Sequence, residues 1–488
     1  MAKRKRSAKR PQPNHKPARG GSQFDKRQRL ERPNPQRAKT TEPKVPLVGF
    51  MAEAVGRMSG MLDRRIAFRL LIICAGMMFA DDRRVAAAWF VSAGVQDDWD
   101  RFYDCLISIG KNSRQLALPL AITVLHKFAR GSDRPIRVAI DDSPTKRYGK
   151  CVEGAGVHHH PTPGPADGEW LYGHNWVCLC LLATHPLWGV IALPLLSWLY
   201  VRAVDVPGLD AKYGWKFQTK HQLAVDLIDW LVGIVRSLEL SNQIWLVADG
   251  AYASSRVIGP LRKHRVVFFS RLRKDAQLFD LPAARQPGQR GRPRKYGVNR
   301  ISLAKRAAHR DGWESTTYRC RGENVTRQCK SFLATSRFAG GVIRVVIVRF
   351  ADESWAAYFC TDPNIAVVDI LETVSARWAI EEHFHDVKEV WGAGQQQVCN
   401  IWSNVGCWHL NQWMYTLVEL SSWDDAEPDM FDRAKRPWDN QDRRPSHADK
   451  RRAISKKMLE KHFLVNLPPT AQTSKIRQLI ADLISMVA

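Results

Sequence analysis

The sequence predicts an α/β fold whose core is interrupted by a β-rich insertion and flanked by helical regions. Apolar runs of strand length end in Asp141 and in Asp249. Strand and helix patterns alternate over residues 131–275, whereas residues 276–365 contain mainly strand patterns. These changes of pattern divide the chain into a disordered basic segment (1–45), a helical region that is a candidate DNA-binding domain (46–130), the first part of the core (131–275), the insertion (276–365), the second part of the core (366–423) and a basic helical C-terminal region (424–488).

The net charge predicts a polyanionic partner. The chain carries a formal charge of +26; residues 1–44 hold 15 Lys or Arg against 3 Asp or Glu, or +12, which leaves +14 on the rest. The first segment is rich in Pro, Lys and Arg and poor in apolar residues, so we expect it to stay disordered until it meets a polyanion. Its KRKR run also fits a nuclear-localisation signal, although bacterial DNA-binding proteins carry such runs as well. Because the body is basic as well as the tail, nucleic acid is the expected partner.

The apolar stretches predict no membrane segment. No apolar region follows the basic N-terminus, so we expect no secretory signal. The longest apolar stretches, 67–80 and 187–201, are interrupted by Arg69 and Pro194 and are shorter than the roughly 18 residues of a membrane span. The 10 cysteines form no C-x2-C pair, which indicates buried thiols rather than a zinc site or a disulfide framework. We therefore expect a cytoplasmic protein without a membrane partner.

Residues 46–130 contain a candidate DNA-binding motif. Helical patterns at 83–90 and 96–106, joined by a short turn that ends at Gly94, have the proportions of a helix-turn-helix. Two helices joined through a glycine occur in any helical domain, so an ordinary packing role stays open.

The core is predicted from its order of strands and helices. The runs Ile136–Asp141 and Ile244–Asp249 are predicted strands. An Asp at the carboxyl end of a strand is a common position for a catalytic group in α/β proteins, and it is also a common start of a turn. The other predicted elements are a hairpin (175–184 and 189–196), two helices (221–238 and 254–263) and a strand (266–270), which together give the order β-β-β-α-β-α-β.

The insertion combines strands with a basic loop. Residues 287–296, which include Arg292 and Arg294, form a Gly/Pro-rich basic loop that resembles minor-groove hooks, or else serves as a solvated linker. The strands predicted after it lie at 317–321, 330–335, 342–350 and 355–360.

A histidine-rich loop between residues 154 and 174 allows a second reading. His158, His159 and His160, with Asp167, Glu169 and His174 nearby, could form a metal cluster. Consecutive histidines point in different directions and no cysteine accompanies them, so a polar loop or a phosphate contact is the preferred interpretation over structural zinc.

The helix predicted at about 370–391 places three charged residues on one face. Arg377, Glu381 and Lys388 have the spacing R-x3-E-x6-K. The apolar positions that can dock this helix on a core are Ile380, Phe384, Val387 and Trp391. A carboxylate can bind a divalent metal ion and flanking cations can bind phosphates, so the face suits phosphoryl transfer. A solvated face with ordinary ion pairs is the alternative, but the two upstream aspartates favour a catalytic site.

These residues resemble a known family. Over roughly residues 60–420 the chain resembles a DDE transposase of a bacterial insertion sequence, from the group with the signature Y-x2-R-x3-E-x6-K. Arg377, Glu381 and Lys388 match the signature. The signature tyrosine falls on Val374, so a hydroxyl that would hold a phosphate is missing.

The resemblance implies an RNase H-like core and a catalytic triad of Asp141, Asp249 and Glu381 that binds two Mg²⁺ ions, with Mn²⁺ as a substitute. Successive strand residues face opposite ways, and the family motif D-x-T/S favours Asp141 as the ligand, with Asp142 as the alternative. The residues expected to contact DNA are Arg377, Lys388, Lys146, Arg292 and Arg294.

The resemblance also implies a reaction and partners. A water and then the freed 3′-hydroxyl would attack the DNA, without a covalent protein–DNA intermediate. The partners would be double-stranded DNA at the element ends and at the target, bound by a homodimer or a larger synaptic complex in the bacterial cytoplasm, associated with the nucleoid. Two alternatives stay open: an RNase H-like nuclease without transfer activity, and a non-catalytic DNA-binding protein derived from a transposase.

Overall fold

The computed structural model describes residues 45–465 with gaps at 82, 96, 161–162, 164–167, 286–289, 427–429, 431–437, 439 and 441–442, and beyond 465 it describes only residues 476, 478–480 and 482–483. The chain divides into two units, Met1–Glu42 and Pro43–Ala488, and the described residues belong to the second. Almost all of the segment predicted to be disordered (1–45) lies outside the described residues.

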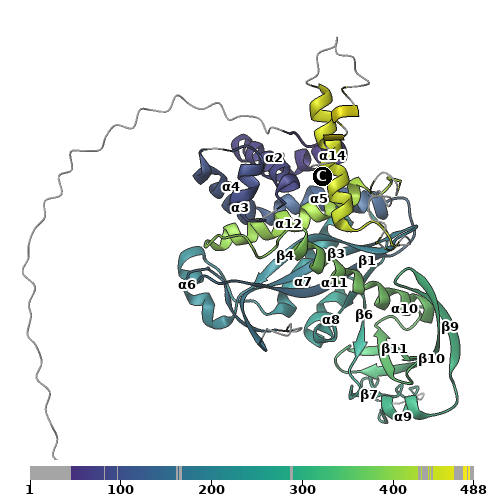
Figure 1. Cartoon of the computed structure of the whole chain (residues 1–488). Helices are drawn as coiled ribbons and strands as arrows, with labels where there is room; N and C mark the ends of the chain where they lie inside the picture. The colour runs from purple at the N-terminus through teal and green to yellow at the C-terminus, as the bar shows by residue number, and fades with distance from the viewer. Residues whose placement is uncertain are drawn as a thin grey trace, which may run out of the picture. The chain divides into compact units, whose positions relative to one another are not determined.

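The N-terminal part is helical, as predicted. Its helices are α1 (Gly49–Ser59), α2 (Arg64–Phe79), α3 (Ala86–Ser92), α4 (Trp99–Lys111) and α5 (Ser113–Phe128). Helix α2 begins at Asp63, whose carboxylate accepts hydrogen bonds from two backbone N–H groups of the first turn. Helices α3 and α4 occupy the predicted helix-turn-helix segment (Figure 1). Their use in DNA binding stays a prediction.

Helix α4 is held tightly against α12 (Ile401–Ser421). A Cβ atom added at Gly110 of α4 would lie 1.9 Å from the carbonyl oxygen of Trp402, and one added at Gly406 of α12 would lie 2.2 Å from that of Leu106. Only glycine permits so close a crossing of two helix backbones. The pair of glycines therefore fixes the N-terminal helices to the core.

In the described part of the chain, twelve strands form one sheet. They are β1 (Ile136–Lys146), β2 (Gly156–His159), β3 (Trp170–His185), β4 (Gly189–Tyr200), β5 (Ile244–Ala248), β6 (Val267–Leu272), β7 (Leu278–Phe279), β8 (Arg300–Ile301), β9 (Glu314–Cys320), β10 (Glu323–Ser336), β11 (Gly341–Arg349) and β12 (Trp355–Cys360). Their order is β2-β3-β1-β5-β6-β12-β11-β10-β7-β8, with β4 paired to β3 and β9 paired to β10. The predicted core elements are present in the predicted order, but the structure adds β2 and helix 206–213, which were not predicted; the chain is a mixed α/β protein.

Two features of the sheet differ from the sequence prediction. Strand β1 continues beyond Asp141 to Lys146, because its second half pairs antiparallel with β3 as far as Gly173. The insertion strands do not stand apart from the core. Strand β12 pairs antiparallel with β6, so the sheet runs continuously from the core into the insertion. The short helix α9 (Leu303–Ala308) lies within the insertion and was not predicted.

Helices complete the core. They are η1 (Ala203–Asp205), α6 (Val206–Tyr213), α7 (Lys220–Ser237), α8 (Ser255–Lys263), α10 (Val367–Ala376) and α11 (Trp378–Glu389). Helix α7 begins with a capping box between Thr219 and Gln222. Within the described part of the chain, no helix has the length and apolar character needed to cross a membrane.

The helix predicted at about 370–391 is two helices that meet at Arg377. The N–H of Arg377 bonds to the carbonyl of Val374, and the N–H of Ile380 bonds to the carbonyl of Arg377. These are three-residue spacings, which tighten the turn and separate α10 from α11.

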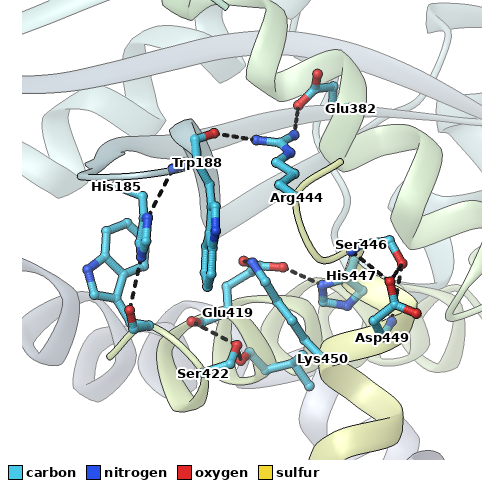
Figure 2. Close-up of polar contacts among 12 residues, drawn as sticks. His185, Trp188, Glu382, Glu419, Ser422, Arg444, Ser446, His447, Asp449 and Lys450 are labelled. Atoms are coloured by element: carbon cyan, nitrogen blue, oxygen red, sulfur yellow. Dashed lines mark hydrogen bonds and ion pairs between the residues drawn. The ribbon is translucent and has the colours of Figure 1, made fainter. Parts of the chain in front are cut away.

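The C-terminal helix α14 (His447–Val465) is tied to the core by buried charges (Figure 2). Glu419 of α12 contacts Nδ1 of His447 at 2.7 Å and accepts a hydrogen bond from Nζ of Lys450 at 2.5 Å. Burial raises the pKa of Glu419, but Lys450 and His447 together lower it to about 2. The Lys450 ammonium also lies 4.2 Å from the ring of Trp188, which stacks on His185.

Two basic residues near the start of α14, Lys450 and Arg451, are thus internal. Arg451 donates to the carbonyls of Met77, Met78 and Ala80, where α2 ends. Lys450 neutralises the buried carboxylate of Glu419, and Arg451 donates to buried carbonyl oxygens; neither side chain forms part of a basic surface.

Candidate active site

Asp141, within β1, and Asp249, directly after β5, lie next to each other. Strands β1 and β5 are parallel, and the last residues that they pair are Ile140 and Ala248. The residues that follow are Asp141 and Asp249, so the two side chains leave neighbouring strands at the same level and on the same face. Asp249 then starts the short helix η2 (Gly250–Tyr252), because its carboxylate accepts a hydrogen bond of 3.3 Å from the N–H of Ala251.

Arg377 joins Asp141 to Glu381. One terminal nitrogen of its guanidinium donates to Oδ2 of Asp141 at 2.7 Å, and the other donates to Oε1 of Glu381 at 2.7 Å. Glu381 is one helical turn beyond Arg377 on α11, which explains their pairing. The three predicted catalytic residues therefore come from β1, β5 and α11, with the guanidinium lying between two of them.

The Asp141 carboxyl is strongly perturbed. Burial raises its pKa to about 7, although the Arg377 guanidinium and the N–H of Asp142 oppose the rise. The neighbouring carboxylates of Asp142 and Asp249 raise the pKa further. A group with these surroundings is typical of a functional site.

Asp142 belongs to a different network. Its carboxylate accepts a hydrogen bond of 2.6 Å from Nζ of Lys220, at the start of α7, and one of 3.1 Å from the hydroxyl of Tyr252. Tyr252 is buried and ends η2, three residues after Asp249. Asp142 therefore ties β1 to the turn that carries Asp249, and it does not share Arg377 with Asp141. Neither Lys220 nor Tyr252 was predicted from the sequence, where the signal for Tyr252 is its place in the run ADGAY after the strand.

Lys388 and Lys146 line one cavity, whose wall does not include Asp141, Asp249 or Glu381. The cavity has a volume of about 920 Å³ and extends from the end of β1 to the end of α11. Burial lowers the pKa of Lys388. The other basic side chains on its wall are Arg83, Arg147 and His160.

Arg147 is fixed in this wall. It donates to the carbonyls of Gly394 and Gln396 at 2.7 and 2.9 Å and to Nδ1 of His174 at 3.1 Å. Burial and the adjacent Arg147 lower the pKa of His174 to about 3, so this histidine is a neutral acceptor. His174 thus has a structural partner, Arg147, and holds the loop through the carbonyl of Glu153.

The remaining predicted residues lie elsewhere. Arg292 and Arg294 are exposed in the connection between β7 and β8, at the far end of the sheet from β1, so the structure does not bring them to the carboxylates. Among the described residues, no three His, Cys, Asp or Glu side chains are grouped closely enough to hold a metal ion. The zinc alternative for the histidine loop therefore has no support there, and Asp167 lies outside the described residues.

Comparison with known proteins gives one family. A family model described as DDE superfamily endonuclease matches residues 57–328, which is more than half of the chain. Among solved structures, the chain is similar to a piggyBac transposase in a synaptic complex with hairpin DNA, studied by cryo-electron microscopy. The two are 10% identical with a TM-score of 0.35, over 89% of this chain and 76% of that chain. No curated protein matches the chain.

Proposed function

The chain belongs to the DDE superfamily endonucleases, and we propose that it is the transposase of a bacterial insertion sequence, with an RNase H-like core. It would cut DNA at the ends of a mobile element and join those ends to a new site. The observation that carries the proposal is that Asp141 follows the strand pairing next to Asp249 and shares Arg377 with Glu381, although these residues come from separate parts of the chain.

The superfamily generally uses divalent metal ions, and the donor set fits them in kind. Asp141, Asp249 and Glu381 offer carboxylate oxygens, the ligands that Mg²⁺ and Mn²⁺ prefer. In this structure the three carboxylates do not converge on one point, because the Arg377 guanidinium lies between Asp141 and Glu381. When bound there, the ions would activate the attacking oxygen and stabilise charge on the leaving oxygen.

The cations of the chain would position the DNA. Lys388 and Lys146 line one cavity at the end of β1 and would bind backbone phosphates of the DNA. Arg292 and Arg294 lie far along the sheet, so they would contact a separate stretch of DNA. Bound in this way, a scissile phosphate is held for attack by water and then by a DNA 3′-hydroxyl. The working unit would be a dimer or a larger complex that holds both ends, beside the nucleoid in the bacterial cytoplasm.

Two other functions compete with this proposal. A nuclease without transfer activity would use the same carboxylates but release cut DNA. A non-catalytic DNA-binding protein would not need all three carboxylates; the pairing of Asp141 and Glu381 with one arginine, next to Asp249, argues against it.

The experiment uses labelled DNA that carries the inverted repeats flanking the gene, a target plasmid and Mg²⁺. The wild type should yield cut ends and joined products, whereas Asp249→Asn and Glu381→Gln should yield neither while still binding DNA. Asp229→Asn is the matched control, because this carboxylate on α7 pairs with His264 on the surface and should leave both products unchanged. Cut ends without joined products would establish the nuclease instead, and cleavage by Asp249→Asn at the wild-type rate would exclude that residue from the site.

A further inference from the structure

Arg377 has two roles to reconcile. The sequence pattern assigns it to a DNA phosphate, yet both terminal nitrogens of its guanidinium are bonded to carboxylates of the chain itself. Its side chain is 24% exposed, so it lies at the surface of the carboxylate cluster and solvent reaches it. A guanidinium in this place neutralises acids that would otherwise repel one another.

We infer that Arg377 is an exchangeable counter-ion. It holds Asp141 and Glu381 in the free protein and transfers to a DNA phosphate when a divalent cation takes over the two carboxylates. Binding of the cation and binding of DNA would then strengthen each other. This inference rests on the proposed function, because it requires that these carboxylates bind metal.

The charges favour such an exchange. Asp141, Asp249 and Glu381, when ionised, carry three negative charges against the one positive charge of Arg377. The surplus of two negative charges attracts a divalent cation. Once the cation is bound, the net charge that the guanidinium faces falls from three negative charges to one, so the carboxylates hold the guanidinium much less strongly.

The chemistry of arginine permits the second half of the exchange. A guanidinium donates two parallel hydrogen bonds to a carboxylate or to a phosphate with nearly the same geometry. Arg377 stands at the tightened turn between α10 and α11, next to Trp378. Arg321 of the insertion lies 4.1 Å from the ring of Trp378, which holds this turn from outside. The backbone can therefore stay in place while the Arg377 side chain changes partners.

A fixed structural ion pair is the competing explanation. In that case Arg377 would keep its carboxylates in every state, and metal and DNA would bind independently. The two explanations differ in a measurable quantity, because coupling between two ligands is reciprocal and appears in either binding constant.

The test measures Mn²⁺ binding to the full chain by electron paramagnetic resonance, with and without a short linear DNA duplex that carries the element's terminal repeat. The wild type should bind Mn²⁺ on the order of tenfold more tightly when the duplex is present. Arg377→Gln should bind Mn²⁺ more tightly than the wild type without DNA, and the duplex should produce no further gain. Arg377→Lys retains the charge but has a single nitrogen to share, so its coupling should fall severalfold while the fold is preserved.

Arg321→Gln is the matched control, since it removes a positive charge beside the same turn without touching Asp141 or Glu381. It should keep the wild-type coupling. Equal coupling in the wild type, Arg377→Gln and Arg377→Lys would overturn the inference and leave the proposed function intact. A wild type that binds no Mn²⁺ with or without DNA, or binds it as well after Asp249→Asn, would instead remove the proposed metal site itself.

Discussion

Asp141 and Asp142 are consecutive residues of β1, yet their carboxylates enter two separate networks, one with Arg377 and one with Lys220 and Tyr252. Strand geometry separates them, because neighbouring side chains on a strand point to opposite faces. The first network contains Glu381, and the second stabilises the turn that carries Asp249. Asp141 and Asp142 therefore connect the candidate site with the turn that positions Asp249.

Because the two carboxylates belong to separate networks, substitution of Asp142 and substitution of Asp141 should have different effects on the protein. Asp142→Ala leaves the buried Tyr252 hydroxyl without its acceptor and Lys220 without its ion pair, so it should lower the free energy of unfolding by about 1–3 kcal/mol. Asp142→Asn keeps an oxygen for Tyr252 and should cost less. Urea denaturation of both variants measures the difference. Equal stability of Asp142→Ala and the wild type would show that the network does not hold the turn.

The raised pKa of Asp141 predicts a pH dependence of stability. With a pKa of about 7 in the folded protein and about 4 when unfolded, Asp141 binds its proton in the folded state only, between those two values. The folded state therefore loses stability as pH rises from about 4 to about 7, and the contribution is constant above that range. Asp141→Asn should remove this loss.

Urea denaturation without added metal ions, compared between the wild type and Asp141→Asn, isolates this contribution because all other titrating groups are shared. The stability of the variant relative to the wild type should increase by more than about 1 kcal/mol from about pH 5 to about pH 8. A difference that stays constant with pH would contradict the raised pKa.

The sequence predicts the position of the aspartates well, for a local reason. An apolar run of strand length followed by Asp predicts the start of the strand and the position of the aspartate, although β1 continues to Lys146, and the β1–β5 pairing then brings Asp141 and Asp249 together. The helical spacing of Arg377 and Glu381 is equally local, and their ion pair follows from it.

Long-range pairings are what the sequence does not predict. The junction of β6 with β12 joins residues about 90 positions apart, and no local pattern encodes it. The partner of Arg377 is also non-local: the same guanidinium can bind a phosphate or Asp141, and only the folded chain decides between them. For the same reason the basic residues Lys450 and Arg451 suggest a surface, whereas they meet Glu419 and the end of α2 in the interior.

The buried ion pairs of Glu419 predict that a single substitution at this position destabilises the protein strongly. Glu419→Gln leaves Lys450 buried without its counter-ion and should destabilise the protein by about 3–5 kcal/mol. The loss should concentrate at α14, which these contacts attach to α12 (Figure 2). Hydrogen exchange of α14 measures the local effect. The double variant Glu419→Gln, Lys450→Met should recover part of the stability because it removes the unpaired charge; a double variant no more stable than the single one would mean that packing, and not charge, holds α14.

We expect substitution of Lys388 to weaken DNA binding without changing the stability of the protein. The Lys388 side chain lines the cavity at the end of β1 and, within the described residues, has no hydrogen bond or ion pair to lose. Lys388→Gln should therefore unfold within about 0.5 kcal/mol of the wild type. If its ammonium binds a backbone phosphate, the variant should bind DNA several times more weakly, and the slope of log affinity against log salt should fall by about 1.

Lys263→Gln is the control, since this lysine is exposed at the end of α8 and away from the cavity. Titration of labelled duplex at several salt concentrations gives both slopes. Identical slopes for Lys388→Gln and Lys263→Gln would show that Lys388 does not contact DNA, and the cavity would then have another function.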